Sequence, residues 1–286
     1  MQKKWFNEVL YNNNDYGYSQ SVLIKEPIVS VNSEFQSIEI FENPFFGKVL
    51  TLDGVMQTTE RDEFFYHEMF VHVPLFSHKN PKKVLIIGGG DGGILREVLK
   101  HSVVESVVMV EIDGMVVSLC KEHMPSLSAG AFSNKRAEVI IGDGIDYVKN
   151  TNQTFDVIIV DSTDPINCGE VLFTKDFYQN AKNILNDGGI IATQSGVPFF
   201  QTEELKNIKD KLGSLVQHFT FYVVPVPTYV GGFMCLSLAT DVALELNNKE
   251  LIAKRVSKDN LSFKYYNADI HIASFALPEY IKKILN

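Results

Sequence analysis

The stretch Val84-Leu85-Ile86-Ile87-Gly88-Gly89-Gly90-Asp91-Gly92-Gly93 decides the fold of this chain. Its first four residues are apolar and predict a buried strand, and the glycines that follow predict a tight turn. The next run, Ile94-Leu95-Arg96-Glu97-Val98-Leu99, has the pattern of a helix. A strand, a glycine-rich turn and a helix in this order form the phosphate-binding corner of dinucleotide-binding folds. Gly88, Gly90 and Gly93 fit the spacing G-x-G-x-x-G of that corner.

One residue of this turn argues against a dinucleotide ligand. Asp91 lies where a pyrophosphate would bind, and its carboxylate would repel the phosphate charge. The turn is therefore expected to hold an adenosine ligand that carries positive charge. Asp91 is also placed to cap the helix that starts at Gly92 or Gly93, and this capping role is compatible with ligand binding.

Two patterns of hydrophobicity divide the chain. Short β-branched or alternating runs between residues 20 and 59 predict the hairpins of a small antiparallel sheet, and residues 61–78 predict a helix. From Lys82 onward, apolar runs alternate with helical stretches, which predicts a Rossmann-like parallel α/β sheet with helices on both faces. We expect an N-terminal β-hairpin domain at residues 1–60 and a catalytic domain at residues 61–286. The strands expected in the larger sheet are 84–87, 107–110, 137–141, 157–160, 190–194, 219–225 and 232–239.

Composition excludes several classes of function. Of the 286 residues, 45% are hydrophobic, which is enough to bury a sizeable core, and the formal net charge is −9. Because the chain has no basic tract and no run of eighteen apolar residues, neither nucleic-acid binding nor a membrane span is expected. Cys120, Cys168 and Cys235 are widely spaced, so we expect neither a disulfide framework nor a zinc ribbon. Since the N-terminus lacks the apolar stretch of a signal peptide, a cytoplasmic protein is expected.

Acidic residues follow four of the predicted strands. Asp91 comes after the first strand, Glu111 after the second, Asp143 after the third, and Asp161 and Asp164 after the fourth. In open parallel sheets, ligands bind beyond the carboxyl ends of the strands. Acids gathered in one pocket repel each other unless a cation shares the pocket. The pattern therefore predicts a polycationic ligand beside an adenosine.

The individual acids also have structural interpretations. Glu111 stands where related folds place an acid that accepts hydrogen bonds from ribose hydroxyls, although a solvated acid at a strand end is the alternative. Asp143, which precedes Gly144, predicts a tight turn close to a flat ligand such as adenine, or an ordinary Asp-Gly turn. Pro165 keeps Asp164 out of the helical region, so an extended loop is expected there.

Several other polar side chains also have ordinary structural interpretations. His67-Glu68 and His72 resemble the motif H-E-x-x-H, but five residues place the two histidines about 140° apart on a helix. We therefore expect no metal site. Tyr66 fits a helix that faces a core with its hydroxyl available, whereas Tyr229 is equally well explained as a buried structural residue of a Pro/Gly-bracketed loop.

Taken together, these motifs resemble the spermidine synthase family of aminopropyltransferases. The resemblance covers almost the whole chain, and its most specific string runs from Asp53 to Phe64, DGVMQTTERDEF. The other matching segments are Trp5-Phe6, Tyr66-His67-Glu68-Met69, Gly88 to Gly93, Glu111-Ile112-Asp113, Gly142-Asp143-Gly144, Asp161 to Pro165, Pro227-Thr228-Tyr229, Lys264-Tyr265-Tyr266-Asn267 and Phe275-Ala276-Leu277-Pro278.

The resemblance implies a methyltransferase-type sheet and the transfer of an aminopropyl group from decarboxylated S-adenosylmethionine to putrescine. The donor is a co-substrate, and no cofactor or metal is implied. Asp161 would be the catalytic base. Residues assigned to the donor, or to the product methylthioadenosine, are Gln36, Gly88, Gly90, Glu111, Asp143, Gly144 and Cys168. Residues assigned to the polyamine are Trp5, Tyr66, His67, Asp91, Asp161, Ser162, Thr163, Asp164, Gln194 and Tyr229.

The chain departs from the family pattern at one position. Many bacterial relatives read D-P-I-G-P-G-E after the catalytic acid, whereas this chain reads D-P-I-N-C-G-E from Asp164 to Glu170. Cys168 thus replaces a proline that lies near the nucleoside in the family. The resemblance also implies a homodimer or homotetramer with the N-terminal β domain in its contacts.

Several alternatives remain open at the level of sequence. Within the family, cadaverine, agmatine or spermidine could replace putrescine as the acceptor. Outside it, the glycine motif and Glu111 also fit an NAD-dependent oxidoreductase, against which Asp91 argues by phosphate repulsion. An S-adenosylmethionine methyltransferase would place the carboxylate of its donor against the acid cluster. A nucleoside or polyamine sensor without turnover is the non-enzymatic alternative.

Overall fold

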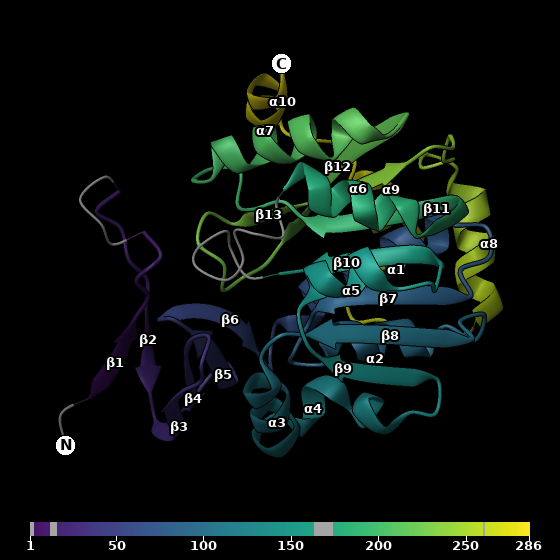
Figure 1. Cartoon of the computed structure of the whole chain (residues 1–286). Coiled ribbons are helices and arrows are strands. Elements are labelled where there is room, and N and C mark those ends of the chain that lie inside the picture. Colours follow the sequence, from purple (N-terminus) through teal and green to yellow (C-terminus); the bar gives the residue numbers. More distant parts are fainter. Residues whose placement is uncertain (1–2, 12–15, 163–173, 260) are drawn as a thin grey trace.

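The computed structural model of the chain describes residues 3–11, 16–162, 174–259 and 261–286 (Figure 1). A seven-stranded sheet forms its centre, with the strand order β12-β13-β11-β10-β7-β8-β9. The strands are β7 (Lys83–Gly88), β8 (Ser106–Glu111), β9 (Ala137–Ile141), β10 (Phe155–Asp161), β11 (Leu185–Gln194), β12 (His218–Pro225) and β13 (Phe233–Thr240). All seven correspond to strands that the sequence predicts.

The direction of β13 differs from the expected parallel arrangement. β7 to β11 pair in parallel, whereas β13 is antiparallel to both β11 and β12. A parallel connection needs a long crossover, but only residues 226–232 join β12 to β13. These two strands therefore form a hairpin, and the sheet is mixed at this edge.

Helices cover both faces of the sheet because successive residues of each strand point to opposite sides. Val84 and Ile86 of β7 pack with α1 (Glu63–Ser77) and α2 (Gly93–Lys100). Leu85 and Ile87 face the other side, together with α5 (Gly144–Asn150), α6 (Lys175–Asn183), α7 (Thr202–Lys211) and α10 (Glu279–Leu285). Because both faces of the sheet are covered by helices, the strands are apolar along their whole length, as expected.

A second sheet, drawn in purple and dark blue in Figure 1, lies beside the carboxyl ends of the central strands. It has the order β3-β4-β5-β6, and a separate hairpin pairs β1 with β2. The bounds of these strands are β1 (Lys4–Asn7), β2 (Ser21–Ile24), β3 (Glu26–Asn32), β4 (Ser37–Asn43), β5 (Gly47–Leu52) and β6 (Val55–Thr59). β1 and β6 were absent from the sequence-based prediction.

The N-terminal sheet has an apolar layer on each side. Ile38, Ile40 and Leu50 pack against α3 (Gly114–His123) and α4 (Pro125–Ser128) of the larger part. On the other side, Phe41, Val49 and Met56 pack with Phe6 of β1. The first layer fixes the small sheet beside the ends of β7 and β8, so residues of both sheets reach one site.

The remaining elements lie around these two sheets. Those in the described part of the chain are two short 3-10 helices, η1 (Ala131–Ser133) and η3 (Gly213–Leu215), and two α-helices, α8 (Lys249–Asp259) and α9 (Ala268–Ala273). No helix in the described ranges combines the length and apolar character needed to cross a membrane.

Candidate active site

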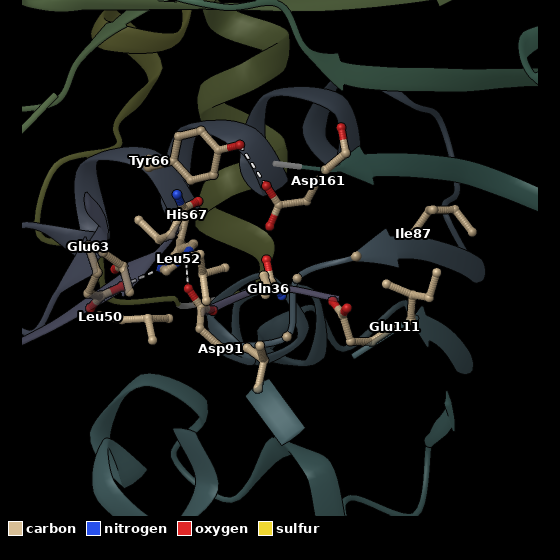
Figure 2. Close-up of a pocket in the computed structure, with 18 of the residues that line it drawn as sticks. Gln36, Leu50, Leu52, Glu63, Tyr66, His67, Ile87, Asp91, Glu111 and Asp161 are labelled. Carbon is tan, nitrogen blue, oxygen red and sulfur yellow. Dashed lines mark hydrogen bonds and ion pairs between the residues drawn. The ribbon is translucent and has the colours of Figure 1, made fainter. Parts of the chain in front are cut away.

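A cavity opens where the carboxyl ends of the central strands meet the N-terminal sheet (Figure 2). Its empty volume, counted together with the open solvent at its mouth, is about 1170 Å³. The central sheet contributes the glycine loop and the acids that follow four of its strands. The N-terminal sheet and its turns contribute apolar and amide side chains, among them Gln36, Leu50, Leu52 and Gln57. The prediction that Asp91, Glu111, Asp143 and Asp161 lie at one edge agrees with this lining.

The glycine loop is packed directly against the end of β10. Gly88 has a φ of +85°, and a β-carbon there would lie 1.9 Å from the carbonyl oxygen of Asp161. The Gly89 N–H donates a hydrogen bond of 3.2 Å to the same oxygen. This close approach requires glycine, and it brings Asp91 and Asp161 to one wall of the cavity.

Asp91 both caps its helix and faces the cavity. Its Oδ1 accepts a hydrogen bond of 2.6 Å from the Gly93 N–H in the first turn of α2. Its Oδ2 lies 3.3 Å from Nε2 of His67, as Figure 2 shows. The structure thus assigns one carboxylate oxygen to each contact. His67 is held tightly in turn, since a β-carbon at Gly93 would lie 2.1 Å from its ring.

His67 connects Asp91 to a second buried acid. Its Nδ1 lies 2.7 Å from Oε2 of Glu63, and Arg96 contacts the same Glu63 oxygen at 2.7 Å. Burial lowers the pKa of His67, but the two carboxylates outweigh burial and raise that pKa to about 10. Burial raises the pKa of Glu63, yet His67 and Arg96 bring it down to about 2. His67 is therefore an imidazolium that donates to both acids at neutral pH.

Asp161 ends β10 and forms a hydrogen bond with α1. The Tyr66 hydroxyl donates to Oδ1 of Asp161 at 2.7 Å (Figure 2). Burial and the nearby Asp91 raise the pKa of Asp161 to about 6, although the Tyr66 hydrogen bond and His67 oppose this shift. Burial, followed by the charge of Asp161, raises the pKa of Tyr66 well above its usual range, so its hydroxyl stays protonated. A carboxylate with such a raised pKa beside a fixed donor is suited to accept a proton.

The acids on the other side of the cavity are held by backbone amides. Glu111 accepts a hydrogen bond of 2.9 Å from the Asp113 N–H, and burial, followed by the charges of Asp113 and Asp161, raises its pKa to about 7. Asp143 caps α5 by accepting from the Ile145 N–H at 2.7 Å. The loop after β9 approaches β7 closely, because a β-carbon at Gly144 would lie 2.5 Å from Ile87.

Gln36 reaches the cavity from the N-terminal sheet. Its side-chain amide donates to Oδ2 of Asp113 at 2.9 Å, and the Ser33 hydroxyl donates to the same oxygen at 2.7 Å. The other oxygen of Asp113 caps α3 through the Met115 N–H. Asp113 therefore joins the two sheets and places Gln36 at the cavity wall.

A second cavity adjoins the first. Its empty volume is about 530 Å³. Five residues line both cavities, namely Gln57, Tyr66, Asp161, Ser162 and Tyr229. The Tyr229 hydroxyl donates to the carbonyl oxygen of Gln57 at 2.8 Å, so it spans this junction. Within the described residues, the buried Ser162 hydroxyl has no hydrogen-bond partner. Asp161 is accordingly accessible from two sides.

Some predicted site residues do not line either cavity. Trp5 lies on β1 with 51% of its surface exposed, and it is not among the described residues that line the second cavity. Gln194 is buried at the end of β11, where its side-chain oxygen accepts from the Gly196 N–H at 3.0 Å. Thr163, Asp164 and Cys168 lie outside the described residues.

Other site residues were missed from the sequence. Glu63, Gln57 and Asp113 line or support the cavity, and all three belong to strings that carry the family resemblance. Their position within those strings was the signal that could have identified them as site residues. The spacing of Glu63 and His67, four residues apart on α1, was a usable signal for their contact, whereas Arg96 lies on a different helix and its contact with Glu63 has no local signal.

His67 and His72, five residues apart on α1, face different partners. His72 contacts His101 at 2.8 Å and Glu97 at 2.9 Å, away from Asp91 and Glu63. Burial is the main cause that lowers the pKa of His72 to about 4. Among the described residues, no group of three or more His, Cys, Asp or Glu side chains is arranged so that it could hold a metal ion.

We expect these two histidines to have opposite effects on the pH dependence of stability. His67 has a raised pKa, so its contribution is complete below pH 6.5 and is lost as the pH rises through 10. His72 has a lowered pKa, so the folded protein is penalised as the pH falls from 6.5 toward 4. The difference in unfolding free energy between wild type and His67→Gln should shrink from pH 6.5 to 10. For His72→Gln it should shrink from pH 6.5 to 4. Urea denaturation across pH 4–10 measures both, and parallel trends would contradict the assignment.

The fold and the cavity define an α/β protein with an acid-lined ligand site at the carboxyl edge of its central sheet. Residues 63–249 match the spermine/spermidine synthase domain, and residues 4–60 match the spermidine synthase tetramerisation domain. The chain belongs to the spermine/spermidine synthase family. It is 48% identical to polyamine aminopropyltransferase 1 of Pseudomonas aeruginosa, with 96% of both chains covered. It is 47% identical to polyamine aminopropyltransferase of Escherichia coli, with 99% of this chain and 98% of the relative covered.

Solved structures give the same result for the fold. A spermidine synthase in complex with the transition-state analogue AdoDATO has a TM-score of 0.93 and 41% identity, covering 99% of this chain and 96% of its own. Spermidine synthase from Thermotoga maritima has a TM-score of 0.91 and 40% identity, covering 100% and 95% respectively. The predicted fold class, a methyltransferase-like α/β sheet preceded by a small antiparallel sheet, is confirmed.

Proposed function

We propose that this protein is a spermidine synthase, which transfers the aminopropyl group of decarboxylated S-adenosylmethionine to putrescine. The observation that carries the proposal is the position of Asp161, which lines both cavities and accepts a hydrogen bond from Tyr66. A base at the junction of two cavities can accept a proton from an amine in one of them while a donor occupies the other. The family membership of the chain supports the same reaction.

The first cavity suits the donor. Glu111 would accept hydrogen bonds from the ribose hydroxyls, and the Asp143-Gly144 loop would lie against adenine. The sulfonium and the aminopropyl ammonium of the donor would face Asp91 and Asp161, which offset their charge. Gln36, held by Asp113, closes the cavity from the N-terminal sheet. In this proposal, the carbon next to the sulfonium would lie near the junction.

The proposed reaction is a nucleophilic substitution in which an amine displaces a thioether, and it needs no cofactor. The lone pair of a neutral amine forms a C–N bond to the methylene carbon, and the C–S bond breaks. Its electron pair passes to the sulfonium, which leaves as the neutral thioether methylthioadenosine, while Asp161 takes the amine proton. Only about one alkyl amine in a thousand is neutral at pH 7, so a base contributes directly to the rate.

The charges in the cavity disfavour the alternative ligands. Asp91 accepts a hydrogen bond from the Gly93 N–H, which a bound phosphate would need as a donor. The phosphates of a dinucleotide would therefore be repelled by the Asp91 carboxylate and would also lack this donor. The carboxylate of ordinary S-adenosylmethionine would face Asp91 and Asp161, whereas its decarboxylated form carries only cationic groups there. These observations favour an aminopropyl donor over NAD or a methyl donor.

Incubation of the purified protein with decarboxylated donor and a panel of amines tests the function, with mass spectrometry of the products. Spermidine and methylthioadenosine from putrescine are expected, and cadaverine, agmatine and spermidine serve as competing acceptors. Three other outcomes would contradict the proposal. Methyl transfer from ordinary S-adenosylmethionine would indicate a methyltransferase, and hydride transfer with NAD would indicate an oxidoreductase. Tight methylthioadenosine binding without turnover would indicate a sensor. A thermal shift with methylthioadenosine but not with NAD separates the two nucleotide classes.

Replacing Glu111 with glutamine should weaken methylthioadenosine binding by about tenfold, because a charged acceptor of ribose hydroxyls is lost. Burial raises the pKa of Glu111 to about 7, so wild-type affinity should increase as the pH rises from 6.5 to 8. The Glu111→Gln protein should show no such increase. Isothermal titration calorimetry across this range measures both, and an equal pH dependence in the variant would exclude Glu111 as the ribose acceptor.

Assembly and location form a smaller part of the proposal. The match of residues 4–60 to a tetramerisation domain indicates an oligomer, and we propose a homodimer or homotetramer with the N-terminal sheet in its contacts. The buried Cys120 and Cys235 are free thiols, which fits a reducing cytoplasm. Light scattering coupled to size-exclusion chromatography gives the mass of the assembly.

A further inference from the structure

A row of five charged side chains runs from the first cavity into the interior, and their charges alternate. Asp91 lies at the cavity wall, and its Oδ2 is 3.3 Å from Nε2 of His67. Glu63 contacts both His67 and Arg96 at 2.7 Å. Arg96 in turn lies 2.7 Å from Oε1 of Glu97. At most 14% of any of these side chains is exposed, so water screens their charges little and each charge affects its neighbours strongly.

The geometry of this row requires a proton on both ring nitrogens of His67. A neutral imidazole has one N–H group and one lone pair, so it could donate to only one of two carboxylates. Its lone pair would then face the other carboxylate, at 2.7 Å for Glu63 or 3.3 Å for Asp91. Glu63 therefore contributes to the positive charge of His67 together with Asp91, and Arg96 holds the Glu63 carboxylate from the other side.

The charged and titratable groups near His67 come from several elements. They are Glu63 and Tyr66 on α1, Asp91 before α2, Arg96 on α2, Asp161 at the end of β10, and Lys264, whose Nζ is 4.0 Å from Oε1 of Glu63. Glu63 and Asp161 are both ionised above pH 7.5, because their pKa values are about 2 and about 6. A change in the charge of His67 above this pH can therefore be followed without a change in either acid.

We propose that Glu63, held by Arg96, is a positioning residue that fixes the ring and the positive charge of His67 and so limits the negative charge that Asp91 presents to the donor. This inference rests on the proposed function, since it takes a cationic donor as the ligand of the first cavity. An uncompensated Asp91 would bind the sulfonium and the ammonium more tightly. Because the sulfonium becomes a neutral thioether in the reaction, tighter binding of its charge beforehand would slow the displacement.

Glu63→Gln tests the effect on His67 directly. Glutamine still offers an oxygen to Nδ1 of His67 and to Arg96 but carries no charge, so the pKa of His67 should fall from about 10 by about 2. Nitrogen-15 chemical shifts of the ring report its protonation by NMR, and His67→Gln assigns the signals. In the wild-type protein, both ring nitrogens should stay protonated up to pH 9.

Glu68→Gln is the matched control, because Glu68 lies on the same helix and only 2% of its surface is exposed. Its carboxylate accepts hydrogen bonds from the backbone N–H groups of residues 264–266. The loss of a buried acid should lower the melting temperature of both variants, but only Glu63→Gln should change the titration of His67.

Calorimetry connects the charge of His67 to the donor. Methylthioadenosine lacks the sulfonium and the ammonium of decarboxylated S-adenosylmethionine, but both ligands contain the ribose that Glu111 would bind. The ratio of their affinities therefore cancels the titration of Glu111. In Glu63→Gln this ratio should rise about fivefold in favour of the donor from pH 7.5 to 9, as His67 loses its charge, and in the wild-type protein by less than about twofold. The single-turnover rate of the variant should fall relative to wild type over the same range.

The outcomes separate this inference from the function on which it rests. A neutral His67 in the wild-type protein at pH 8 would overturn the proposal, and this measurement needs no variant to fold. The same titration of His67 in Glu63→Gln and Glu68→Gln, or an unchanged affinity ratio despite earlier loss of the proton, would also overturn it. Failure of the wild-type protein to bind the decarboxylated donor or to transfer its aminopropyl group would instead overturn the proposed function, and the charge of His67 measured by NMR would stand.

Discussion

Replacing Asp161 with asparagine should lower the single-turnover rate by about 10³-fold, while the protein still binds methylthioadenosine. The expected loss is that of a general base, since asparagine retains the shape of the side chain but cannot take the amine proton. Asparagine can still accept the hydrogen bond of 2.7 Å from the Tyr66 hydroxyl, so the local structure should persist. Rapid-quench measurement at saturating donor and acceptor gives the rate, and calorimetry gives the binding.

The pH profile provides a second measure of the same residue. Burial and Asp91 raise the pKa of Asp161 to about 6 in the free protein, and only the carboxylate form accepts a proton. With donor saturating, the cationic sulfonium favours the carboxylate form, so wild-type kcat/KM for the acceptor should rise with pH through a midpoint below the free-protein value, and this limb should vanish in Asp161→Asn. Tyr66→Phe is the control, with an expected loss of about tenfold, because it removes one neutral donor. An unchanged rate in Asp161→Asn with intact binding would mean that another group is the base.

Replacing Gly88 with alanine should destabilise the protein by roughly 3–5 kcal/mol, as the sum of backbone strain and a forced shift of packed atoms. The φ of +85° alone is unfavourable for alanine, and its β-carbon would meet the carbonyl oxygen of Asp161 at 1.9 Å. The neighbour is backbone, so no side chain can move aside. Urea denaturation should show the loss, and any folded fraction should be impaired in catalysis because Asp161 is displaced.

Gly130 provides a matched control for this substitution. Its φ is +83°, almost the same as that of Gly88, but a β-carbon there would have no heavy atom within 4 Å. Gly130→Ala should therefore cost only the backbone strain, about 1–2 kcal/mol, and leave the activity unchanged. Similar losses at both positions would show that the contact with Asp161 is not the reason for glycine at residue 88.

The part of the site predicted from sequence followed from one regular feature of the fold. Parallel strands of similar length end at the same edge, so reading the residue after each strand located Asp91, Glu111, Asp143 and Asp161 without any contact information. The strands themselves were predictable because they are buried on both faces and therefore continuously apolar. The positions of these apolar strands along the chain were therefore enough to locate the acids that follow them.

Contacts between distant segments were not predictable in this way. Asp113 is held between Gln36 and Ser33, residues about 80 positions earlier in the chain. Likewise, the contact between Glu63 and Arg96 joins α1 to α2 and has no local signal, whereas Glu63 and His67, four residues apart on α1, could have been paired from their spacing. β1 and β6 were missed although β1 is no shorter than β2, which was predicted. Such short segments gain their stability from pairing with a neighbouring strand, and local patterns do not reveal that pairing.

The construction of the first cavity from two sheets has a thermodynamic consequence. A nucleoside that contacts both the glycine loop and the N-terminal sheet binds only when both parts are folded and docked. Binding must then stabilise the docking itself, by about 2.7 kcal/mol at a ligand concentration one hundred times Kd. Saturation with donor thus acts as a clamp between residues 4–60 and the remainder of the chain. Hydrogen exchange in β4 and β5 should slow together with that in β7 when the nucleoside binds, although these strands belong to separate sheets.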